Sequence, residues 1–325
     1  MSALSLSLRA VARRAGGLTV RSVDVSDERP DVARLLRGRR VAEALELVGR
    51  LYGVCGQAQR VAAAVAVAVA RDGGGEPTVE SRLRMQREAL QEHAMRILLD
   101  WPRAFGLPVD VARLRELARR LAVEAATPAA AAEAIGGVLD DLLPGSGWLA
   151  GGARTPPAVA QLFECVADGE CAAHGGDARP VAEEGAYARF AEDPWVAGWQ
   201  SGGRPVCARL AARFVALREI VACWRRGAAA EAGDVRAEAL EAHAARCVVD
   251  TARGRLAHQV VLDGERVADW RITVPTDVNF APGGAWVRRV AGASAADVAA
   301  LRSHGACWAR ALDPCVEWRL EVCDA

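Results

Sequence analysis

The chain has 325 residues with equal numbers of basic and acidic side chains, so its formal net charge is zero. This balance excludes a global electrostatic attraction to nucleic acid or to an anionic membrane surface. No apolar stretch reaches the roughly 18 residues of a bilayer-spanning segment, and no basic secretory signal is recognisable at the start, so we expect one compact cytoplasmic unit over residues 1–325.

The N-terminal region is predicted to form an antiparallel pair of strands. Apolar and polar residues alternate over residues 3–9 and 18–25, as in half-buried strands, and Ala15-Gly16-Gly17 lies between them as the turn. The pattern then becomes helical over residues 30–51 and again over residues 57–71. The chain is therefore expected to begin with a small sheet and to continue with helices.

The region that follows is predicted to be helical up to a loop-rich segment at residues 144–205. A long helix is expected over residues 79–105. Two more helices, 110–126 and 129–143, are separated by Thr127-Pro128, where threonine can cap a helix and proline fits its first turn.

The loop-rich segment contains three potential soft metal ligands, Cys165, Cys171 and His174. A structural zinc site usually has four ligands with tighter cysteine spacing, and no fourth ligand lies nearby in the sequence. The chain has nine cysteines, and most are expected to be small buried apolar residues in a reducing compartment. The sequence leaves both zinc binding and ordinary loop cysteines open for this trio.

The C-terminal half combines helices with strands. Helices are predicted at 209–226 and 231–243, and a last helix at 295–309 with Ser294 as its cap. Between them, a strand at 246–250 precedes a hairpin whose turn is Asp263-Gly264. The sequence thus predicts an α+β fold, predominantly helical, with an N-terminal strand pair and a β-hairpin near residues 246–274.

Two cysteine motifs lie at opposite ends of the chain. The first is Arg50-Leu51-Tyr52-Gly53-Val54-Cys55-Gly56-Gln57-Ala58-Gln59, and the second is Asp313-Pro314-Cys315-Val316-Glu317-Trp318-Arg319-Leu320-Glu321. They resemble the motifs R-x-C-G-x-C-x-x-x-H and D-P-C-x-x-C-x-x-H of the large subunit of nickel–iron hydrogenases. Each motif is incomplete here: one cysteine and the histidine are replaced in both, by Tyr52 and Gln59 in the first and by Trp318 and Glu321 in the second.

Two further segments lie between these motifs in the same order as in the hydrogenase family. Thr251–His258 resembles A-P-R-G-x-L-x-H, with Ala252 in place of proline, and Val274–Pro282 resembles V-P-T-T-W-N-x-x-P. Four motifs in order cover the chain from end to end. The chain is therefore similar to HupK/HoxV-type hydrogenase expression/formation proteins, degenerate relatives of the large subunit, and this resemblance implies a hydrogenase large-subunit-like helical core.

The resemblance also implies a site. In the family an arginine and a hydroxyl hydrogen-bond the two cyanides of an Fe(CN)2CO group, which are anionic acceptors suited to a guanidinium in a dry pocket. The residues at the matching positions are Arg253 and Thr276 for the cyanides and Val274 and Pro275 as walls. Cys55 matches a cysteine that bridges nickel and iron, whereas Cys315 matches a terminal nickel ligand. Both would bind the iron as thiolates here, and Cys315 would have to turn from a nickel-facing to an iron-facing geometry. Tyr52 and Trp318 would fill the space of the missing nickel ligands.

Nickel binding and catalysis are not expected. The family binds nickel with four thiolates, and only two cysteines lie at matching positions. The glutamate of the family's R-G-x-E motif is also missing, because Arg37-Gly38 is followed by two arginines. Only four residues follow Glu321, so we expect no cleavable extension such as a large-subunit precursor carries.

The resemblance implies an accessory protein of nickel–iron hydrogenase maturation. It would act as a scaffold or carrier that holds the Fe(CN)2CO fragment transiently before delivery to the large subunit. Its partners would be that subunit and the maturation proteins that build or carry the fragment, with no nucleic acid and no membrane insertion. The alternative is a metal-free structural or regulatory module that binds hydrogenase subunits or maturation factors.

Overall fold

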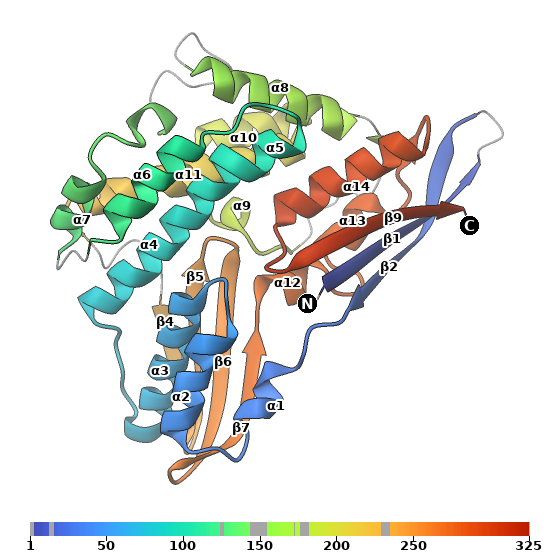
Figure 1. The fold of residues 1–325 in the computed structure, drawn as a ribbon. Helices are drawn as coiled ribbons and strands as arrows, with labels where there is room; N and C mark the ends of the chain where they lie inside the picture. Colours follow the sequence, from blue (N-terminus) through green and yellow to red (C-terminus); the bar gives the residue numbers. More distant parts are fainter. Residues whose placement is uncertain are drawn as a thin grey trace.

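A computed structural model describes residues 3–12, 16–123, 127–143, 155–171, 173–175, 182–228 and 235–324. Figure 1 shows three parts: a helical layer, a four-stranded sheet covered by helices α2 and α3, and a second sheet that contains the strands nearest both ends of the chain. The α+β fold class, predominantly helical, is confirmed. The assignment of residues 1–325 to one unit stays a prediction.

The second sheet has five strands in the order β3-β8-β2-β1-β9. The predicted N-terminal pair is confirmed, because β1 runs antiparallel to β2 and alternates buried Leu4, Leu6 and Leu8 with more exposed residues. On its other side β1 pairs in parallel with β9, a strand that the sequence analysis did not predict. The strands are β1 (Ala3–Ala12), β2 (Leu18–Asp27), β3 (Ala173–His174), β8 (Ser294–Ala295) and β9 (Glu317–Asp324).

The four-stranded sheet has the sequential order β4-β5-β6-β7 and contains the predicted hairpin. Its strands are β4 (Val235–Glu241), β5 (Ala244–Thr251), β6 (Gly254–Asp263) and β7 (Arg266–Thr273). The predicted helix at 231–243 is wrong, because β4 occupies residues 235–241. This segment is rich in the helix formers alanine and glutamate, but pairing with β5 along the sheet edge overrides that local preference.

The face of this sheet is covered by α3 (Gly56–Asp72), with α2 (Val41–Leu51) beside it. Alanine and valine side chains of α3 and apolar residues of β5, β6 and β7 form one hydrophobic core. The helix predicted at 57–71 is confirmed, whereas the one at 30–51 is divided. Gly38, with φ of 76°, lies between α1 (Val32–Leu36) and α2.

The helical layer forms a larger core around α11 (Pro205–Arg225), which is buried on most of its surface. The predicted long helix runs through α4 (Val79–Met95), a π-helical turn η1 (Arg96–Asp100) and α5 (Trp101–Ala104). Thr127 caps α7 (Pro128–Ile135) as predicted, but that helix ends at Ile135, with Gly136 as its C-cap, rather than at residue 143. The remaining elements here are α6 (Val111–Leu121), the 3-10 turn η2 (Asp140–Leu142), α8 (Pro157–Cys171), α9 (Ala186–Phe190) and α10 (Pro194–Ser201).

Two sequence-based expectations are corrected in the remaining elements. The segment 144–205, predicted to be loop-rich, contains the helices α8, α9 and α10; residues 144–154, 172 and 176–181 are outside the described ranges. The last long helix is α14 (Val298–Leu312), and its cap is Asp297, whose carboxylate accepts from the Ala300 amide at 2.8 Å. Ser294 lies instead in β8 and bonds Thr19. Short helices α12 (Pro275–Asn279) and α13 (Ala285–Val290) precede it.

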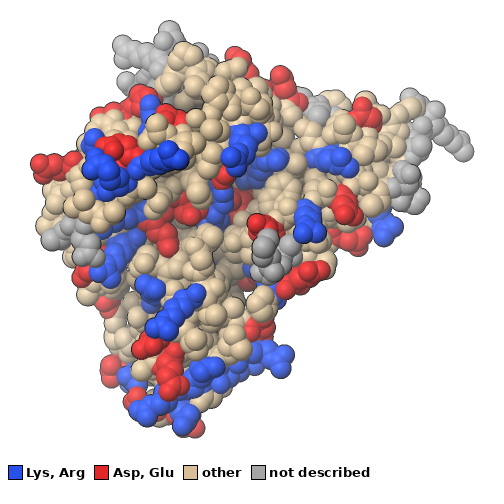
Figure 2. Space-filling view, viewed as in Figure 1, with Lys and Arg blue, Asp and Glu red and all other residues tan. Residues whose placement is uncertain are grey.

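None of the helices in the described ranges is both long and apolar enough to cross a bilayer. Figure 2 shows basic and acidic side chains interspersed over one face, in keeping with a balanced charge.

Candidate metal-fragment site

Four turns that are distant in the sequence converge on one cavity of about 490 Å³. They are the α2–α3 turn, the β5–β6 turn, the connection from β7 into α12 and the segment after α14. Each contains one of the four motifs singled out above. The cavity is lined by Cys55, Arg253, Val274, Pro275 and Cys315, together with Tyr52 and Gln59.

Cys55 lies in the α2–α3 turn with a left-handed backbone, φ of 59°, directly before the first residue of α3. A non-glycine residue rarely adopts this conformation, so the surrounding packing must hold it there. The residue is 8% exposed, and the Arg253 Nη1 donates to its sulfur at 3.6 Å. Burial outweighs the nearby guanidinium and raises the pKa of the Cys55 thiol to about 12. In the metal-free protein this residue is therefore a neutral thiol at neutral pH.

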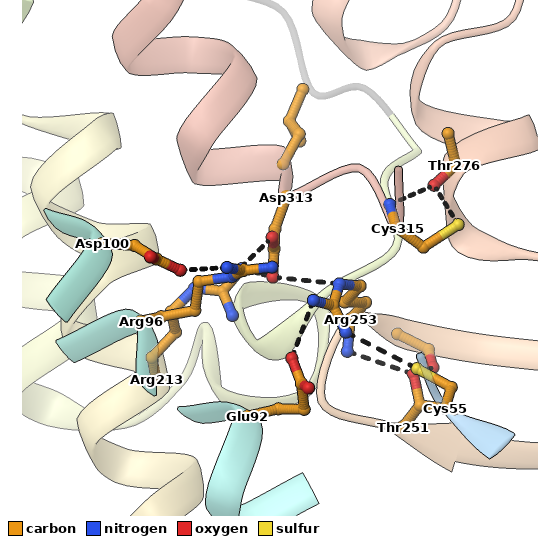
Figure 3. A network of polar contacts seen from close by, with 12 residues as sticks. Cys55, Glu92, Arg96, Asp100, Arg213, Thr251, Arg253, Thr276, Asp313 and Cys315 are labelled. Carbon is orange, nitrogen blue, oxygen red and sulfur yellow. Dashed lines mark hydrogen bonds and ion pairs between the residues drawn. The ribbon is translucent and has the colours of Figure 1, made fainter. Parts of the chain in front are cut away.

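Arg253 lies in the turn between β5 and β6 and is 2% exposed. Thr251 shapes this turn, because its hydroxyl accepts from the Arg253 amide and donates to the Gly254 carbonyl. Gly254 has φ of 124°, and a Cβ there would meet the Gly185 nitrogen at 2.6 Å, so only glycine fits. The arginine Nη2 donates to Glu92 at 2.8 Å, which leaves Nη1 directed at Cys55 (Figure 3).

Asp313 balances the charge behind Arg253. One of its oxygens lies 3.4 Å from Arg253 Nε and 3.1 Å from an Arg213 nitrogen, and the other lies 2.9 Å from Arg96 Nε (Figure 3). Burial alone would raise the pKa of this carboxyl, but the guanidiniums of Arg253, Arg213 and Arg96 outweigh burial and lower it to about 2. Asp313 is thus a buried anion that fixes three cations.

Cys315 and Thr276 form the other side of the site. The Thr276 hydroxyl donates to the Cys315 sulfur at 3.2 Å and accepts from the Cys315 amide at 3.0 Å (Figure 3). Thr276 lies in the first turn of α12, which Asp277 stabilises by accepting from the Val274 amide at 2.9 Å. Thr276 is 1% exposed and lies behind Cys315 rather than among the residues that line the cavity.

Gln59, at the position of a family histidine, accepts from a different histidine. The Trp270 indole donates to His258 Nδ1 at 3.0 Å, so the neutral imidazole has its hydrogen on Nε2 and donates it to Gln59 Oε1 at 2.6 Å. Burial lowers the pKa of His258 to about 3. Gln59, His258 and Trp270 thus form a neutral, fully hydrogen-bonded trio. It holds the first turn of α3 next to Cys55 and places no charge there.

The residues at the other replaced motif positions, Tyr52, Trp318 and Glu321, do not lie together in the structure. Tyr52 lines the cavity, as the sequence analysis expected, and burial raises its pKa. Trp318 lies in β9 and lines a neighbouring cavity of about 620 Å³, which shares Arg253 and Cys315 with the first. Glu321 is exposed on the same strand. Trp318 therefore does not fill the space beside Cys55.

Several residues of the site were missed by sequence reasoning. Glu92, on the long helix α4, and Asp313, inside the second motif, received no role, although an Asp directly before Pro-Cys was visible. Arg29 and Asp277 also line the cavity and bind each other at 2.6 Å. A buried arginine implied by a motif requires buried counter-charges, and that requirement is the signal that could have led to Glu92 and Asp313.

The donor set limits what the cavity can hold. Within the described ranges, no group of three or more Cys, His, Asp or Glu residues is arranged to hold a metal ion. Two thiols beside a guanidinium suit instead a soft metal that arrives with ligands of its own. Of the other candidate trio, Cys165 is half-buried in α8 and His174 is exposed in β3, while the Cys171 side chain lies outside the described residues.

The fold matches that of solved hydrogenases. A chain of the NAD+-reducing NiFe-hydrogenase in the H2-reduced state superposes with a TM-score of 0.55 and 16% identity, over 94% of both chains. The NiFeSe-hydrogenase of Dm. baculatum gives a TM-score of 0.57 and 13% identity, over 97% of this chain and 99% of that one. The chain is therefore a protein of the hydrogenase large-subunit fold, which confirms the fold expected from the motifs.

The sequence relatives are more specific, although no protein-family model matches. The hydrogenase expression/formation protein HupK of Rhizobium leguminosarum bv. viciae is 31% identical, over 94% of this chain and 93% of its own length. HupK of Azotobacter vinelandii is 30% identical, over 94% and 96%. The chain belongs to this family of hydrogenase expression/formation proteins, as the four motifs predicted.

Proposed function

We propose that this protein acts in nickel–iron hydrogenase maturation by holding an Fe(CN)2CO fragment in the cavity between Cys55 and Cys315. The observation that carries the proposal is the Arg253 guanidinium, pinned by Glu92 and Asp313, with its Nη1 directed at Cys55 3.6 Å away. The names of the relatives, expression/formation proteins, support the role in maturation.

The chemistry of the fragment fits the residues present. Thiolates are the preferred protein ligands of soft metal centres, and cyanide nitrogens accept hydrogen bonds best from charged donors. The raised pKa of Cys55 means that this thiol loses its proton when iron binds, with Arg253 beside it to stabilise the resulting thiolate. Val274 and Pro275 would supply an apolar wall for the remaining diatomic ligand.

Release should be part of the same function. Only two of the family's four thiolate positions are cysteines, so nickel would not be bound and the iron fragment would be held less firmly than in a finished binuclear site. The protein would then be a carrier and not an enzyme. Its partners would be the hydrogenase large subunit and the maturation proteins that build or carry the fragment, in the cytoplasm.

The test is infrared spectroscopy and iron analysis on protein purified anaerobically from a host that expresses the hydrogenase maturation genes. We expect bands of bound CO and cyanide, and we expect them to be lost in Cys55→Ala and Cys315→Ala. Cys323→Ala is the matched control, because Cys323 is an exposed thiol on β9 away from the cavity. A correctly folded wild-type protein without iron or such bands, from a host with active hydrogenase, would rule the carrier out.

A metal-free structural or regulatory module is the second candidate. It is favoured by one observation: Arg253 already has two carboxylate partners, Glu92 and Asp313, so its charge is balanced without any ligand in the cavity. Such a module would bind hydrogenase subunits or maturation factors through its surface. Two measurements separate the two functions. A carrier contains iron, whereas a module does not. A module also still binds its partners when both Cys55 and Cys315 are replaced by alanine.

A further inference from the structure

The hydroxyl of Thr276 is already used within the protein. It has one hydrogen, which it donates to the Cys315 sulfur at 3.2 Å, and its oxygen accepts from the Cys315 amide at 3.0 Å. The side chain is buried and lies outside the set of residues that line the cavity. In this arrangement Thr276 positions Cys315, and a ligand beside Cys315 must find its hydrogen-bond donor elsewhere.

Arg29 offers that donor. It follows β2, lines the cavity, and its side chain is 18% exposed. Its Nε and Nη2 bind the Asp27 carboxylate, and Nη2 also donates to Asp277 at 2.6 Å. The remaining nitrogen, Nη1, has the Cys315 sulfur at 3.9 Å as its one partner within the described residues. The two carboxylates therefore fix the guanidinium with its free edge toward Cys315.

The same arrangement occurs on the opposite side of the cavity. Arg253 is fixed by Glu92 and Asp313, and its Nη1 is directed at Cys55. Each thiol thus has one guanidinium nitrogen beside it, and each guanidinium is fixed from behind by two carboxylates. An anionic ligand between the thiols would meet a charged donor at each end, and charged donors make the stronger hydrogen bonds.

We infer that Arg29 is a second binding residue of the site beside Arg253, which donates from Nη1 to an anionic ligand atom of the bound iron fragment on the Cys315 side. This inference rests on the proposed carrier function. Asp277 extends the role, because it accepts both from Arg29 and from the Val274 amide and so couples the guanidinium to the wall of the cavity. The ligand class is a metal-bound anion such as cyanide.

The experiment uses the anaerobically purified full-length chain and compares wild type, Arg29→Gln and Arg29→Lys by iron content and cyanide infrared bands. Arg34→Gln, on the exposed surface of α1, is the matched control. Loss of a charge-assisted hydrogen bond should lower fragment affinity about ten- to hundredfold in Arg29→Gln and shift one cyanide band. Arg29→Lys keeps the charge but lacks the planar fork, so we expect a band shift with a smaller loss of iron.

Circular dichroism and thermal melting establish which variants are folded, and Arg29→Lys decides the question if Arg29→Gln is unstable. The inference is overturned if the folded variant keeps wild-type iron content and band positions, or if the band shift occurs in Thr276→Val instead. A wild-type protein that binds no fragment contradicts the carrier function itself. The two failures are distinguishable. If the carrier function is wrong, the wild-type protein has no cyanide bands. If only the inference is wrong, the wild-type protein has these bands and the Arg29 variants leave them unchanged.

Discussion

The two sides of the cavity differ in how they hold their cysteine. Cys55 is 8% exposed, has a left-handed backbone and faces a guanidinium whose counter-charges are buried. Cys315 is partly exposed and held by a hydroxyl, with Arg29 more distant at 3.9 Å. The motifs place Cys55 at an iron-bridging position and Cys315 at a terminal nickel position of the family. The structure shows that Cys55 is an enclosed thiol beside a buried charged network, whereas Cys315 is partly exposed and hydrogen-bonded mainly to a neutral hydroxyl.

The difference can be tested first by alkylation of the metal-free protein with iodoacetamide. Because burial raises the pKa of the Cys55 thiol to about 12, only a very small fraction of this side chain is a reactive thiolate at pH 8. Its labelling should therefore be slower than that of Cys315 by orders of magnitude and should rise about tenfold per pH unit as pH increases toward 12.

Peptide mapping measures each rate, because cleavage after arginine places Cys55, Cys315 and Cys323 in separate peptides. Cys323, which is exposed, is the fast reference, and all three should label alike in denaturant. Equal rates for Cys55 and Cys323 in the native protein at pH 8 would contradict the enclosed thiol.

The second largest effect should come from Asp313→Asn. This change leaves Arg253, Arg213 and Arg96 without their shared buried anion, and removal of one partner of a buried ion pair costs about 3–5 kcal/mol. The free energy of unfolding from urea titration measures it. Asp269→Asn, which breaks solvent-accessible pairs with Arg37 and Arg271, is the control and should cost about 1 kcal/mol or less.

The same variant has a defined pH dependence. The pKa of Asp313 is lower in the folded protein than in the unfolded chain, so its stabilisation is present above about pH 4 and is lost as pH falls toward 2. The difference in unfolding free energy between wild type and Asp313→Asn should shrink over that window. A constant difference would show that Asp313 acts through packing and not through its charge.

Gln59→Leu should weaken the Cys55 side by a smaller amount. It leaves the His258 Nε2 hydrogen buried without an acceptor, which costs about 1–3 kcal/mol. Gln91→Leu, on the exposed surface of α4, should change stability by about 0.5 kcal/mol or less. Thermal or urea unfolding measures both variants. Equal stabilities would show that the hydrogen bond from His258 to Gln59 does not stabilise the protein.

Thr276→Val should have the smallest effect on stability and act on the Cys315 side alone. It removes one hydroxyl that bonds the Cys315 sulfur and amide, for a cost of about 1 kcal/mol. Thr276→Ser keeps the hydroxyl and should restore most of the loss. Alkylation of Cys315 should become faster in Thr276→Val while that of Cys55 is unchanged; a change at both thiols would mean that the two sides are coupled.

Local patterns predicted much of the fold. The strand pair at 3–9 and 18–25, the hairpin about Asp263-Gly264 and the helix after Cys55 depend on period and turn chemistry, which a single sequence displays. The strand β9 also has a visible pattern, since Trp318, Leu320 and Val322 alternate with polar residues. The same residues also match the degraded second cysteine motif, and that resemblance by itself does not indicate a strand.

Other features depend on contacts that one sequence does not contain. The segment of β4 has helix-forming composition and becomes a strand through its partner β5. Five of the residues taken from the motifs, Cys55, Arg253, Val274, Pro275 and Cys315, line one cavity. The motifs did not predict that the Thr276 hydroxyl bonds Cys315, nor that Arg29 reaches the cavity from the end of β2. Side-chain direction and the location of counter-charges arise only when distant turns come together.

The parallel pairing of β1 with β9 has a consequence for the order in which the parts of the cavity form during folding. These strands lie near opposite ends of the chain, and Cys315 directly precedes β9. During synthesis β1 emerges about 300 residues before β9, and pairing over such a separation is of the slow, long-range kind. We expect the Cys315 wall to be the last part of the cavity to form, so a nascent chain would have no closed site for its cargo before β9 has been synthesised.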